Sequence, residues 1–487
     1  MKRSRFFTLL CLLLAVSLLP SCQNRPHVHS YDEIEVISEN TCTSGGEIKR
    51  KCSCGEGEIY KTVKKSHVLS DWQDNGAGEY VKICSVCHET VGRERIYSYY
   101  SENLAYKFDE DSKTYAVTGR GSCTDAVIVI PPEFNGIPVT GIASRAFLKV
   151  ENVEAVIIPH SVTYISDAAF STSSIKRVFI PDSVTEIGKY AFNQCDQLIE
   201  LILPNSLSKI GKTFLQGTNR IKTVIIPSSL KIIPVSAFAY SSIESISLPE
   251  GVEKIEADAF SHCTRLAEIG LPETLTEICD GAFEECTALT DIILPDSVTC
   301  LAMKSFLGCT ALRSVNIPNG VTKLYSETFG GCKALEKVYF SASLKSLDGT
   351  TFLGIDLTKT EILIPAGNKH FYMLGTSLIG GNRDTVVIGS ADGTIPTDKN
   401  ITKIGNAAFI DRRNLKRILI PKNITHIGGG AFSGCINIGS ISYEGTVAEW
   451  EDVFLGVVWY NGNGVSSVKC SDGEAELVVK SSPSVRD

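Results

Sequence analysis

The sequence predicts a β-rich solenoid, with one short parallel strand in each coil of 22–24 residues and a small Cys/His module in front of the array. Two periodic residues support this fold class. Phe recurs every 22–24 residues, at Phe147, Phe170, Phe192, Phe214, Phe238, Phe260, Phe283, Phe306, Phe329 and Phe352, and again at Phe409 and Phe432. Pro follows most of them by 11–13 positions, at Pro159, Pro181, Pro204, Pro227, Pro249, Pro272, Pro295, Pro318 and Pro421. A fixed period of this length is typical of stacked-repeat architectures.

The order of residues within one unit explains the predicted coil. Leu266, Ile269 and Leu271 have the spacing of a leucine-rich-repeat strand, in which residues two apart share one face. Pro272 ends the strand, because Pro has no N–H to donate to a central ladder. Further apolar residues return to the core, and Phe283 then closes the coil. One coil cannot bury this apolar face alone, so we expect neighbouring strands to stack about 4.8 Å apart.

Composition and motifs, together with the repeats, divide the chain into six segments. They are an export signal at 1–22, a Cys/His module at 23–100, an N-terminal cap at 101–145, leucine-rich repeats at 146–354, a degenerate coil or insertion at 355–400, and final repeats with a C-terminal cap at 401–487. Apolar patches in the insertion favour a degenerate coil and hairpin within the stack, with disorder as the alternative. Caps are expected because the core of an uncovered terminal coil would face water.

The N-terminus predicts export. Three positive residues precede the apolar stretch "FFTLLCLLLAVSLLP" at 6–20, which is too short for a comfortable membrane span. The stretch leads into "LPSC", which resembles the lipobox of bacterial lipoproteins, and this resemblance implies cleavage before Cys22 and lipidation of its thiol. Two or three acyl chains would anchor the protein stably to a membrane. An ordinary secretory peptide with an incidental Cys is the alternative.

Composition and charge exclude some classes of partner. With 43% hydrophobic and 21% charged residues, the chain has a normal globular composition. The net charge is -8, and the body of the chain has no run of Lys or Arg. These values argue against nucleic acid as a partner.

The repeat itself resembles a known family. The pattern Ala-Phe-x-x-Cys-x-x-Leu-x-x-Ile-x-Ile-Pro-x-Ser-Val-x-x-Ile-Gly is nearly complete across 180–188 and 191–204, and it resembles the BspA-like leucine-rich repeats of bacterial surface proteins. The resemblance extends over about residues 101–470. It implies a lipid-anchored protein of the bacterial cell surface or outer membrane that binds extracellular or host-surface proteins. The competing hypotheses are an architectural envelope protein that self-associates, and a redox or haem protein that uses the Cys/His module.

Six cysteines lie three residues after a repeat Phe: Cys195, Cys263, Cys286, Cys309, Cys332 and Cys435. Other coils have Ser173, Gly217 or Ser241 at this position, and such interchange would destroy a set of metal ligands. We therefore expect these thiols to pack as small apolar side chains, with no cofactor in the repeats.

The Cys/His module has two similar halves, and it resembles the short zinc-ribbon-like modules that often precede such repeats. Zinc prefers tetrahedral sets of thiolate and imidazole ligands. The residues offer one full set and the start of a second: His29, Cys42, Cys52 and Cys54, then His67, Cys84 and Cys87. A single ribbon could instead use Cys52, Cys54, Cys84 and Cys87.

Two other chemistries compete with zinc for these residues. Disulfides are permitted outside the cytoplasm, although five non-lipidated cysteines cannot all pair. The string Cys84-Ser-Val-Cys87-His88 matches a c-type haem attachment sequence.

One outward column of the predicted sheet is apolar. The residues between the two inward positions of each strand begin with Ile157, Phe179, Ile202 and Ile225. Exposed apolar patches often mark contact sites, so we expect a protein-binding strip here. The alternatives are that β-branched residues simply suit a strand, or that the N-terminal module covers the strip.

No catalytic residue is predicted. Polar residues in the repeat loops, such as Asp182, Ser183 and His426, are explained by turn chemistry. We therefore expect a binding protein rather than an enzyme.

Overall fold

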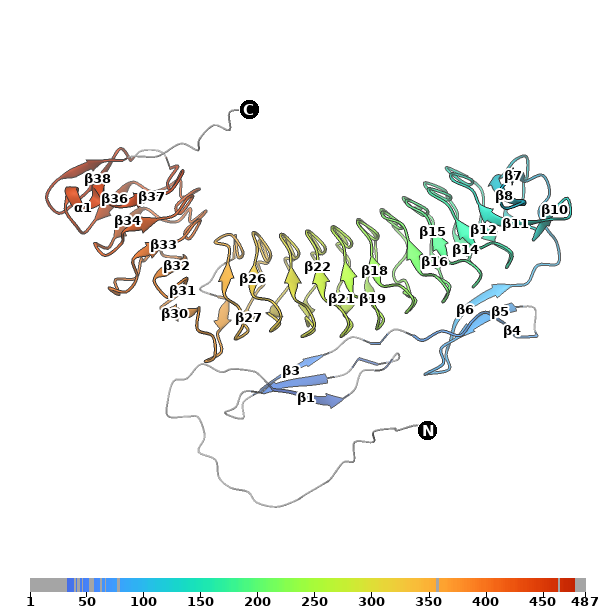
Figure 1. Ribbon diagram of the computed structural model, residues 1–487, viewed down its shortest axis with the longest axis horizontal. Coiled ribbons are helices and arrows are strands. Elements are labelled where there is room, and N and C mark those ends of the chain that lie inside the picture. The colour runs from blue at the N-terminus through green and yellow to red at the C-terminus, as the bar shows by residue number, and fades with distance from the viewer. Residues whose placement is uncertain are drawn as a thin grey trace, which may run out of the picture.

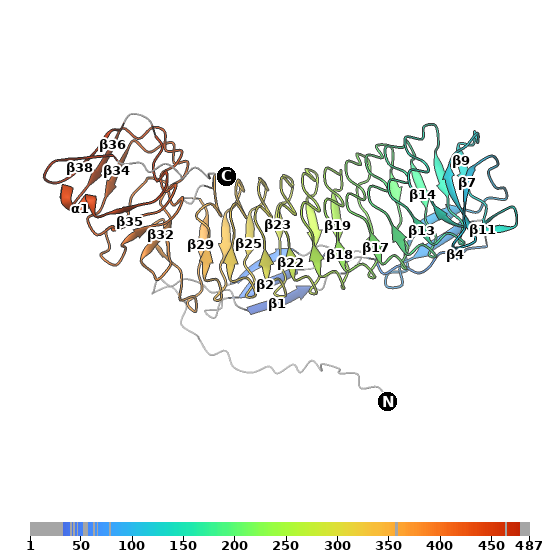
Figure 2. The same ribbon diagram turned by 45° about the horizontal axis from the view of Figure 1, so that its top comes forward.

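The computed structural model describes residues 33–38, 41, 44–45, 47–51, 57–61, 64–65, 67–76, 79–355, 359–462 and 465–477. From residue 101 onward the described chain forms a long solenoid, in which successive coils stack along one axis (Figures 1 and 2). The predicted fold class is confirmed. Most coils also contain a second short strand, so that two parallel ladders run along the array.

The first ladder contains the strand predicted before each Pro. Its strands up to the insertion are β9 (Val127–Val129), β12 (Ala155–Ile157), β14 (Arg177–Phe179), β16 (Glu200–Leu201), β19 (Ser245–Ser247), β21 (Glu268–Gly270), β23 (Asp291–Ile292), β25 (Ser314–Asn316), β27 (Lys337–Tyr339) and β29 (Glu361–Leu363). The register is constant from coil to coil. Val156 is aligned with Val178, and Val315 with Val338, so equivalent side chains form continuous inward columns.

The second ladder lies seven to ten residues after the first in each coil. Its strands up to the insertion are β8 (Thr114–Gly119), β11 (Ile137–Ile142), β13 (Tyr164–Ile165), β15 (Glu186–Ile187), β17 (Lys209–Ile210), β18 (Ile232–Ile233), β20 (Lys254–Ile255), β22 (Glu277–Ile278), β24 (Cys300–Leu301), β26 (Lys323–Leu324) and β28 (Ser346–Leu347). These strands expose polar side chains, and some of these form ion pairs between coils, such as Lys254 with Glu277 at 2.7 Å.

The turn that holds the repeat Phe closes each coil. Backbone hydrogen bonds join these turns from coil to coil, and the Phe170 N–H donates to the Ala191 carbonyl at 2.8 Å. The buried rings stack nearly parallel along most of the array, with Phe260 and Phe283 5.4 Å apart at 3°. Phe214 is the exception, because its ring is almost perpendicular to both neighbours.

Left-handed backbone flanks the repeat Phe in most coils. Around Phe170, for example, Ala168 and Thr172 both have a φ of 56°. Glycine is the residue best suited to this conformation, but only some coils place it there, as at Gly308 with a φ of 74°. Where the residue is not Gly, its Cβ lies close to the backbone, so the left-handed conformation carries some steric strain.

The six repeat cysteines form a ladder of buried thiols. Each Sγ donates to the carbonyl of the Phe one coil earlier, as from Cys286 to Phe260 at 3.1 Å. The other pairs are Cys195–Phe170, Cys263–Phe238, Cys309–Phe283, Cys332–Phe306 and Cys435–Phe409. The thiols thus pack as small side chains, as expected, and each adds a second hydrogen bond to a Phe carbonyl that already accepts a backbone N–H within its own turn, as from Cys263 to Phe260.

Burial of these thiols predicts a loss of stability at alkaline pH. It raises the pKa of Cys263 from its ordinary value of 9.0 to about 11, and that of Cys332 to about 12. Between pH 9 and these values the unfolded chain ionises its thiols while the folded chain keeps them protonated, so the free energy of unfolding falls as pH rises. Urea unfolding across this window should show a steeper loss for the native sequence than for Cys263→Ala/Cys332→Ala. Equal slopes would contradict the expectation.

The residue before the repeat Phe gives a second test of stability. Ser305 is fully buried, and no described group makes a hydrogen bond to its Oγ. At the same position one coil later, the Thr328 Oγ1 donates to the Tyr325 carbonyl at 2.8 Å. We expect Ser305→Ala to raise the free energy of unfolding by about 1 kcal/mol, and Thr328→Val to lower it by about 1 kcal/mol. Urea titrations should show these opposite signs; a loss of stability in Ser305→Ala would contradict the assignment.

Both ends of the array are capped. At the N-terminal end, β7 (Ala105–Asp109) pairs with β8, and β10 (Glu133–Phe134) pairs with β11. At the C-terminal end, α1 (Val447–Glu451) begins at a capping box between Thr446 and Glu449, and β38 (Ser467–Lys469) pairs with β39 (Glu474–Glu476). Trp450 and Trp459 fill the C-terminal core.

The predicted insertion lies within the stack. Strands β30 (Tyr372–Leu374), β31 (Ser377–Gly380) and β32 (Thr385–Ile388) form an antiparallel meander. β32 then pairs in parallel with β33 (Lys403–Ile404), and the ladder continues through β35 (His426–Ile427) and β37 (Phe454–Leu455). The first ladder resumes as β34 (Arg417–Ile420) and β36 (Ser440–Tyr443). The meander separates two hydrophobic cores, one on each side.

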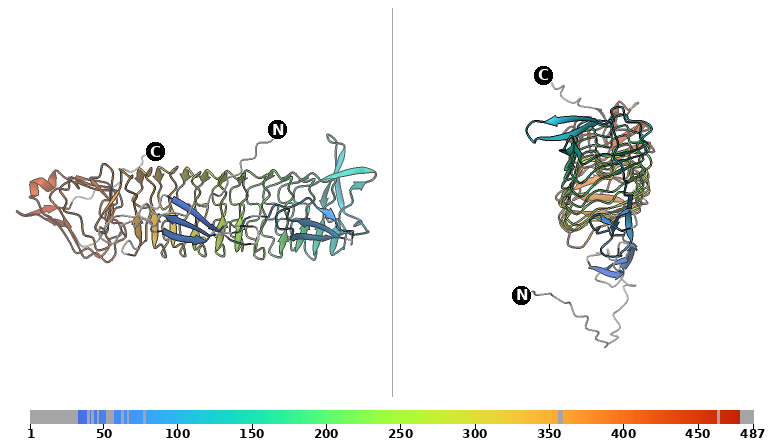
Figure 3. Two further views of the ribbon diagram at one scale, coloured as in Figure 1. Left: turned by 90° about the horizontal axis from the view of Figure 1, so that it is seen from below. Right: turned by 90° about the vertical axis from the view of Figure 1, so that its right-hand side faces the viewer.

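The Cys/His module contains two small antiparallel sheets. The first is β1 (Glu33–Ser38), β2 (Glu47–Lys51) and β3 (Gly57–Lys61), and the second is β4 (Gln73–Asp74), β5 (Glu79–Ile83) and β6 (Thr90–Arg95). Figures 1 and 3 show both sheets along one side of the solenoid.

Candidate functional site: the Cys/His module on the first ladder

The β4–β6 sheet covers part of the apolar strip predicted from the sequence. Phe179, at the end of β14, is only 5% exposed. The Trp72 ring lies 4.9 Å from it, and the Tyr80 ring stacks on it at 6.0 Å between centroids. Ile157 and Ile202 on the neighbouring strands are half-buried. Around Phe179 the strip therefore contacts the chain's own module, which was one of the alternatives raised by the sequence.

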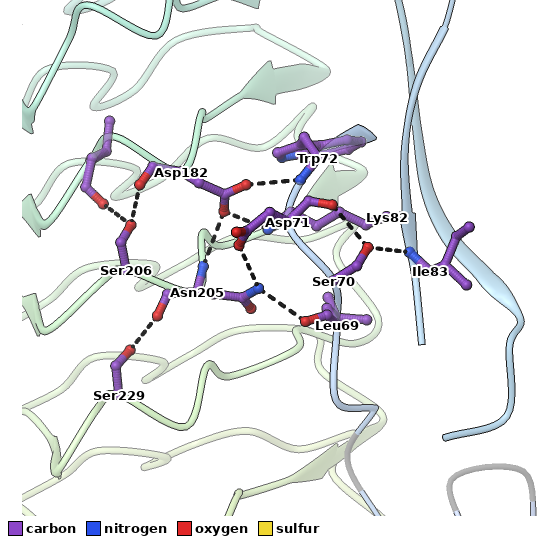
Figure 4. Close-up of polar contacts among 11 residues, drawn as sticks. Leu69, Ser70, Asp71, Trp72, Lys82, Ile83, Asp182, Asn205, Ser206 and Ser229 are labelled. Carbon is purple, nitrogen blue, oxygen red and sulfur yellow. Dashed lines mark hydrogen bonds and ion pairs between the residues drawn. The ribbon is translucent and has the colours of Figure 1, made fainter. Parts of the chain in front are cut away.

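A buried ion pair fixes the sheet to the solenoid. The Lys82 side chain is fully buried, and its Nζ donates to the Asp182 Oδ1 at 2.8 Å. The other carboxylate oxygen, Oδ2, accepts from the Trp72 backbone N–H at 2.9 Å (Figure 4). The Lys82 ammonium also lies 5.5 Å from the centroid of the Trp72 ring. Asp182 thus compensates the buried charge and holds the segment that carries Trp72.

Asn205, one coil further along, makes a second polar contact. Its Nδ2 donates to the Leu69 carbonyl at 3.0 Å and to the Asp71 Oδ1 at 3.2 Å, while its backbone N–H donates to the Asp182 Oδ1 at 3.3 Å (Figure 4). Asp182 and Asn205 both follow the Pro that ends a strand of the first ladder. The turns after these Pro residues therefore hold the module in place.

A third contact joins β6 to β14. The Glu94 carboxylate is 7% exposed and lies 3.8 Å from the Arg177 guanidinium. Burial raises the pKa of Glu94, and the Arg177 charge opposes this shift only in part. The contact pairs a negative charge on β6 with a positive charge on β14, two residues before Phe179.

The remaining strip residue lies at a groove beside the module. Ile225 forms an isolated parallel bridge with Ile202, and it lines a groove of about 310 Å³. Lys64, Lys65 and His67 form the module side of this groove. The groove therefore lies between Ile225 of the strip and His67, one of the candidate metal ligands.

His67, Cys84 and Cys87 form a group that could hold a metal ion, with their ligand atoms all within 4.8 Å of one another. The His67 Nδ1 lies 3.5 Å from the Cys87 Sγ. Tetrahedral zinc separates a bound sulfur from a bound nitrogen by about 3.6 Å, so this pair has the spacing of two zinc ligands, and the group supplies three of the four ligands of a tetrahedral site. Of the other predicted ligands, His29, Cys42, Cys52 and Cys54 lie outside the described residues, as does the predicted lipidation site Cys22.

The environment of Cys84 favours its ligating form. Burial raises the pKa of this thiol, but hydrogen bonds from the Cys87 backbone N–H and the His67 side chain outweigh burial and bring the pKa to about 6. Thiolate is the form that binds metals. His88, which the haem attachment string would use, is exposed and does not belong to the group.

A family model agrees with this architecture. The model described as "BspA type Leucine rich repeat region (6 copies)" matches residues 132–243, 231–358 and 392–455. The chain belongs to this family. The BspA-type repeats thus cover the solenoid on both sides of the insertion, and the Cys/His module precedes them.

Solved structures of other repeat proteins are similar to this BspA-type chain. A leucine-rich repeat protein from Bacteroides ovatus is 22% identical, with 75% of this chain and 92% of that chain covered and a TM-score of 0.49. A leucine rich cell surface protein from Faecalibacterium prausnitzii is 24% identical, covering 74% and 98%, with a TM-score of 0.44. The pneumococcal vaccine antigen PcpA is 20% identical, covering 68% and 98%, with a TM-score of 0.34. No curated protein matches the chain.

The docking residues were not identified from the sequence. In the sequence, turn chemistry is a sufficient explanation for Asp182, and Lys82, Trp72 and Asn205 carry no signal that distinguishes them from other surface residues. Within the part of the chain that the structure describes, no helix has both the length and the apolar character needed to cross a membrane.

Proposed function

We propose that this protein is an exported, lipid-anchored protein of the bacterial cell surface that binds other proteins through its BspA-type repeat array. Binding rather than catalysis is supported by one observation above all: the first ladder already engages a folded protein surface, its own module, through Phe179 and Asp182. The export signal and the lipobox ending at Cys22 support the location. The partners are extracellular or host-surface proteins.

We also propose that the ion held by His67, Cys84 and Cys87 is zinc. Two thiolates and an imidazole are ligands that zinc prefers. The three residues would fix the ion, and the ion would join residues that are 17 and 20 positions apart. A structural role is expected, because the group tethers the end of β5 to the segment that carries Trp72.

Binding to a panel of immobilised matrix and host-surface proteins tests the proposed function. The chain from Cys22 onward, without lipid, should bind at least one of them saturably, and Asp182→Ala should strengthen binding by uncovering the strip. Adding Phe179→Ser and Ile202→Ser to Asp182→Ala should remove that gain. If neither the native sequence nor Asp182→Ala binds any panel member, and sedimentation instead shows concentration-dependent assembly, the architectural alternative would replace this proposal.

A further inference from the structure

The β4–β6 sheet has almost no core of its own. Among the described residues from 67 to 95, Val81 and Cys84 are the only apolar side chains that are buried. The other buried side chains are charged: Lys82 and Glu94 both face partners on the solenoid. Units of fewer than about 40 residues usually need a metal, a disulfide or a partner to remain folded. This sheet therefore depends on contacts outside itself.

The segment 67–72 carries much of the docking contact, and within the described residues Val68 and Ser70 bond it to the end of β5 and to the turn that follows. The Ser85 N–H donates to the Val68 carbonyl, and the Ser70 N–H donates to the Ile83 carbonyl, both at 2.8 Å. From this segment Leu69, Asp71 and Trp72 reach Asn205 and Asp182. If the segment separates from β5, Trp72 and Lys82 can no longer meet Asp182 together.

The metal-ligating group is placed where it would prevent this separation. His67 begins the segment, whereas Cys84 and Cys87 belong to the turn that follows β5. An ion bound to all three would close the loop between the segment and β5. We propose that metal occupancy at His67, Cys84 and Cys87 locks the β4–β6 sheet onto the first ladder, so that the metal decides whether Phe179 is covered or open.

This metal-dependent docking of the β4–β6 sheet, called the lock below, rests on the proposed metal site. It involves contacts within this chain and does not depend on the identity of any protein partner. With metal bound, the Lys82–Asp182 pair is protected from water and the strip is covered. Without metal, the segment frays and the apolar strip around Phe179 becomes available. The module is then a removable cover, and a zinc-poor environment uncovers a protein-binding face.

Hydrogen exchange with and without zinc tests the lock. The chain from residue 23 is reduced and stripped of metal with a chelator, and bound zinc is counted after Zn²⁺ is added back. At free zinc about 100-fold above its dissociation constant, exchange in residues 67–95 should slow by about 100-fold. Peptides from 401–435 should not change, since that part of the array lies far from the β4–β6 sheet (Figure 1).

Variants separate this site from other ligands. Cys87→Ser should lose one bound zinc and the zinc-dependent protection, whereas Cys470→Ser, at a half-buried cysteine of the C-terminal cap, should keep both. Unchanged exchange in the solenoid core peptides shows that each variant is folded. No zinc bound would overturn both the site and the lock. Zinc lost in Cys87→Ser with exchange at 67–95 the same with and without metal would overturn the lock alone.

Discussion

Replacing Asp182 by Ala is expected to detach the β4–β6 sheet from the solenoid. The substitution leaves the fully buried Lys82 ammonium without its counter-charge and removes the acceptor of the Trp72 N–H. Removing one partner of a buried ion pair costs about 3–5 kcal/mol, which exceeds what the remaining contacts of such a small sheet can offset. Hydrogen exchange of residues 67–95 should rise to the rate of an open segment, while the repeats stay protected.

Companion variants of Asp182→Ala make the test specific. Lys82→Met should weaken docking of the sheet less than Asp182→Ala does. Asp182 is 18% exposed, and its carboxylate still accepts hydrogen bonds from the backbone N–H groups of Trp72 and Asn205. The double variant Lys82→Met/Asp182→Ala should recover much of the loss, since no charge is then buried unpaired. Asp196→Ala, which removes an exposed hydrogen bond to Asn219, is the matched control and should leave the module docked. Protection at 67–95 that survives Asp182→Ala would rule out the ion pair as the anchor.

Truncating a ring of the Phe stack is expected to have a comparable effect on the solenoid itself. Phe283 is fully buried between Phe260 and Phe306, with ring centroids 5.4 and 5.3 Å away. Phe283→Ala should lower the free energy of unfolding by about 3–5 kcal/mol, because the stacked coils on both sides cannot close the cavity. Urea unfolding followed by circular dichroism measures the loss.

The exposed Ile232 provides the control for this truncation, because it lies on the outer side of β18 in the same array. Ile232→Ala should change the free energy of unfolding by less than about 0.5 kcal/mol. If the two variants were equally stable, the Phe stack would not be the structural core of the repeats.

The periodic residues predicted the solenoid because they have one function in every coil. Phe fills the same inward position in each coil, and Pro ends the same strand in most coils, so twelve Phe residues give repeated signals for one geometry. The second ladder was less evident, since its strands are mostly two residues long, as in β13 and β15. The left-handed residues beside each Phe were hidden for another reason: most of them are not Gly.

The docking of the module depends on particular residues at otherwise variable positions. Asp182 follows Pro181, but the equivalent positions hold His160 and Asn205, so a polar residue there has no distinguishing mark in the sequence. The ligand chemistry of the module was easier to predict than its position on the solenoid. The sequence already grouped His67 with Cys84 and Cys87 as candidate ligands, whereas only the three-dimensional arrangement shows that their ligand atoms lie within 4.8 Å of one another and that the group lies beside the strip.

The meander formed by β30–β32 has a consequence for how the array comes apart. It interrupts the continuous column of apolar side chains, so the coils from about residue 379 onward pack around a core of their own. Repeats transmit stability only to their neighbours, and a poorly shared boundary divides an array into separate cooperative blocks. The C-terminal block can therefore melt and refold as a foldon while the longer block keeps its shape. A pulling force applied at the C-terminus would therefore reach this block before the coils that contact the β4–β6 sheet.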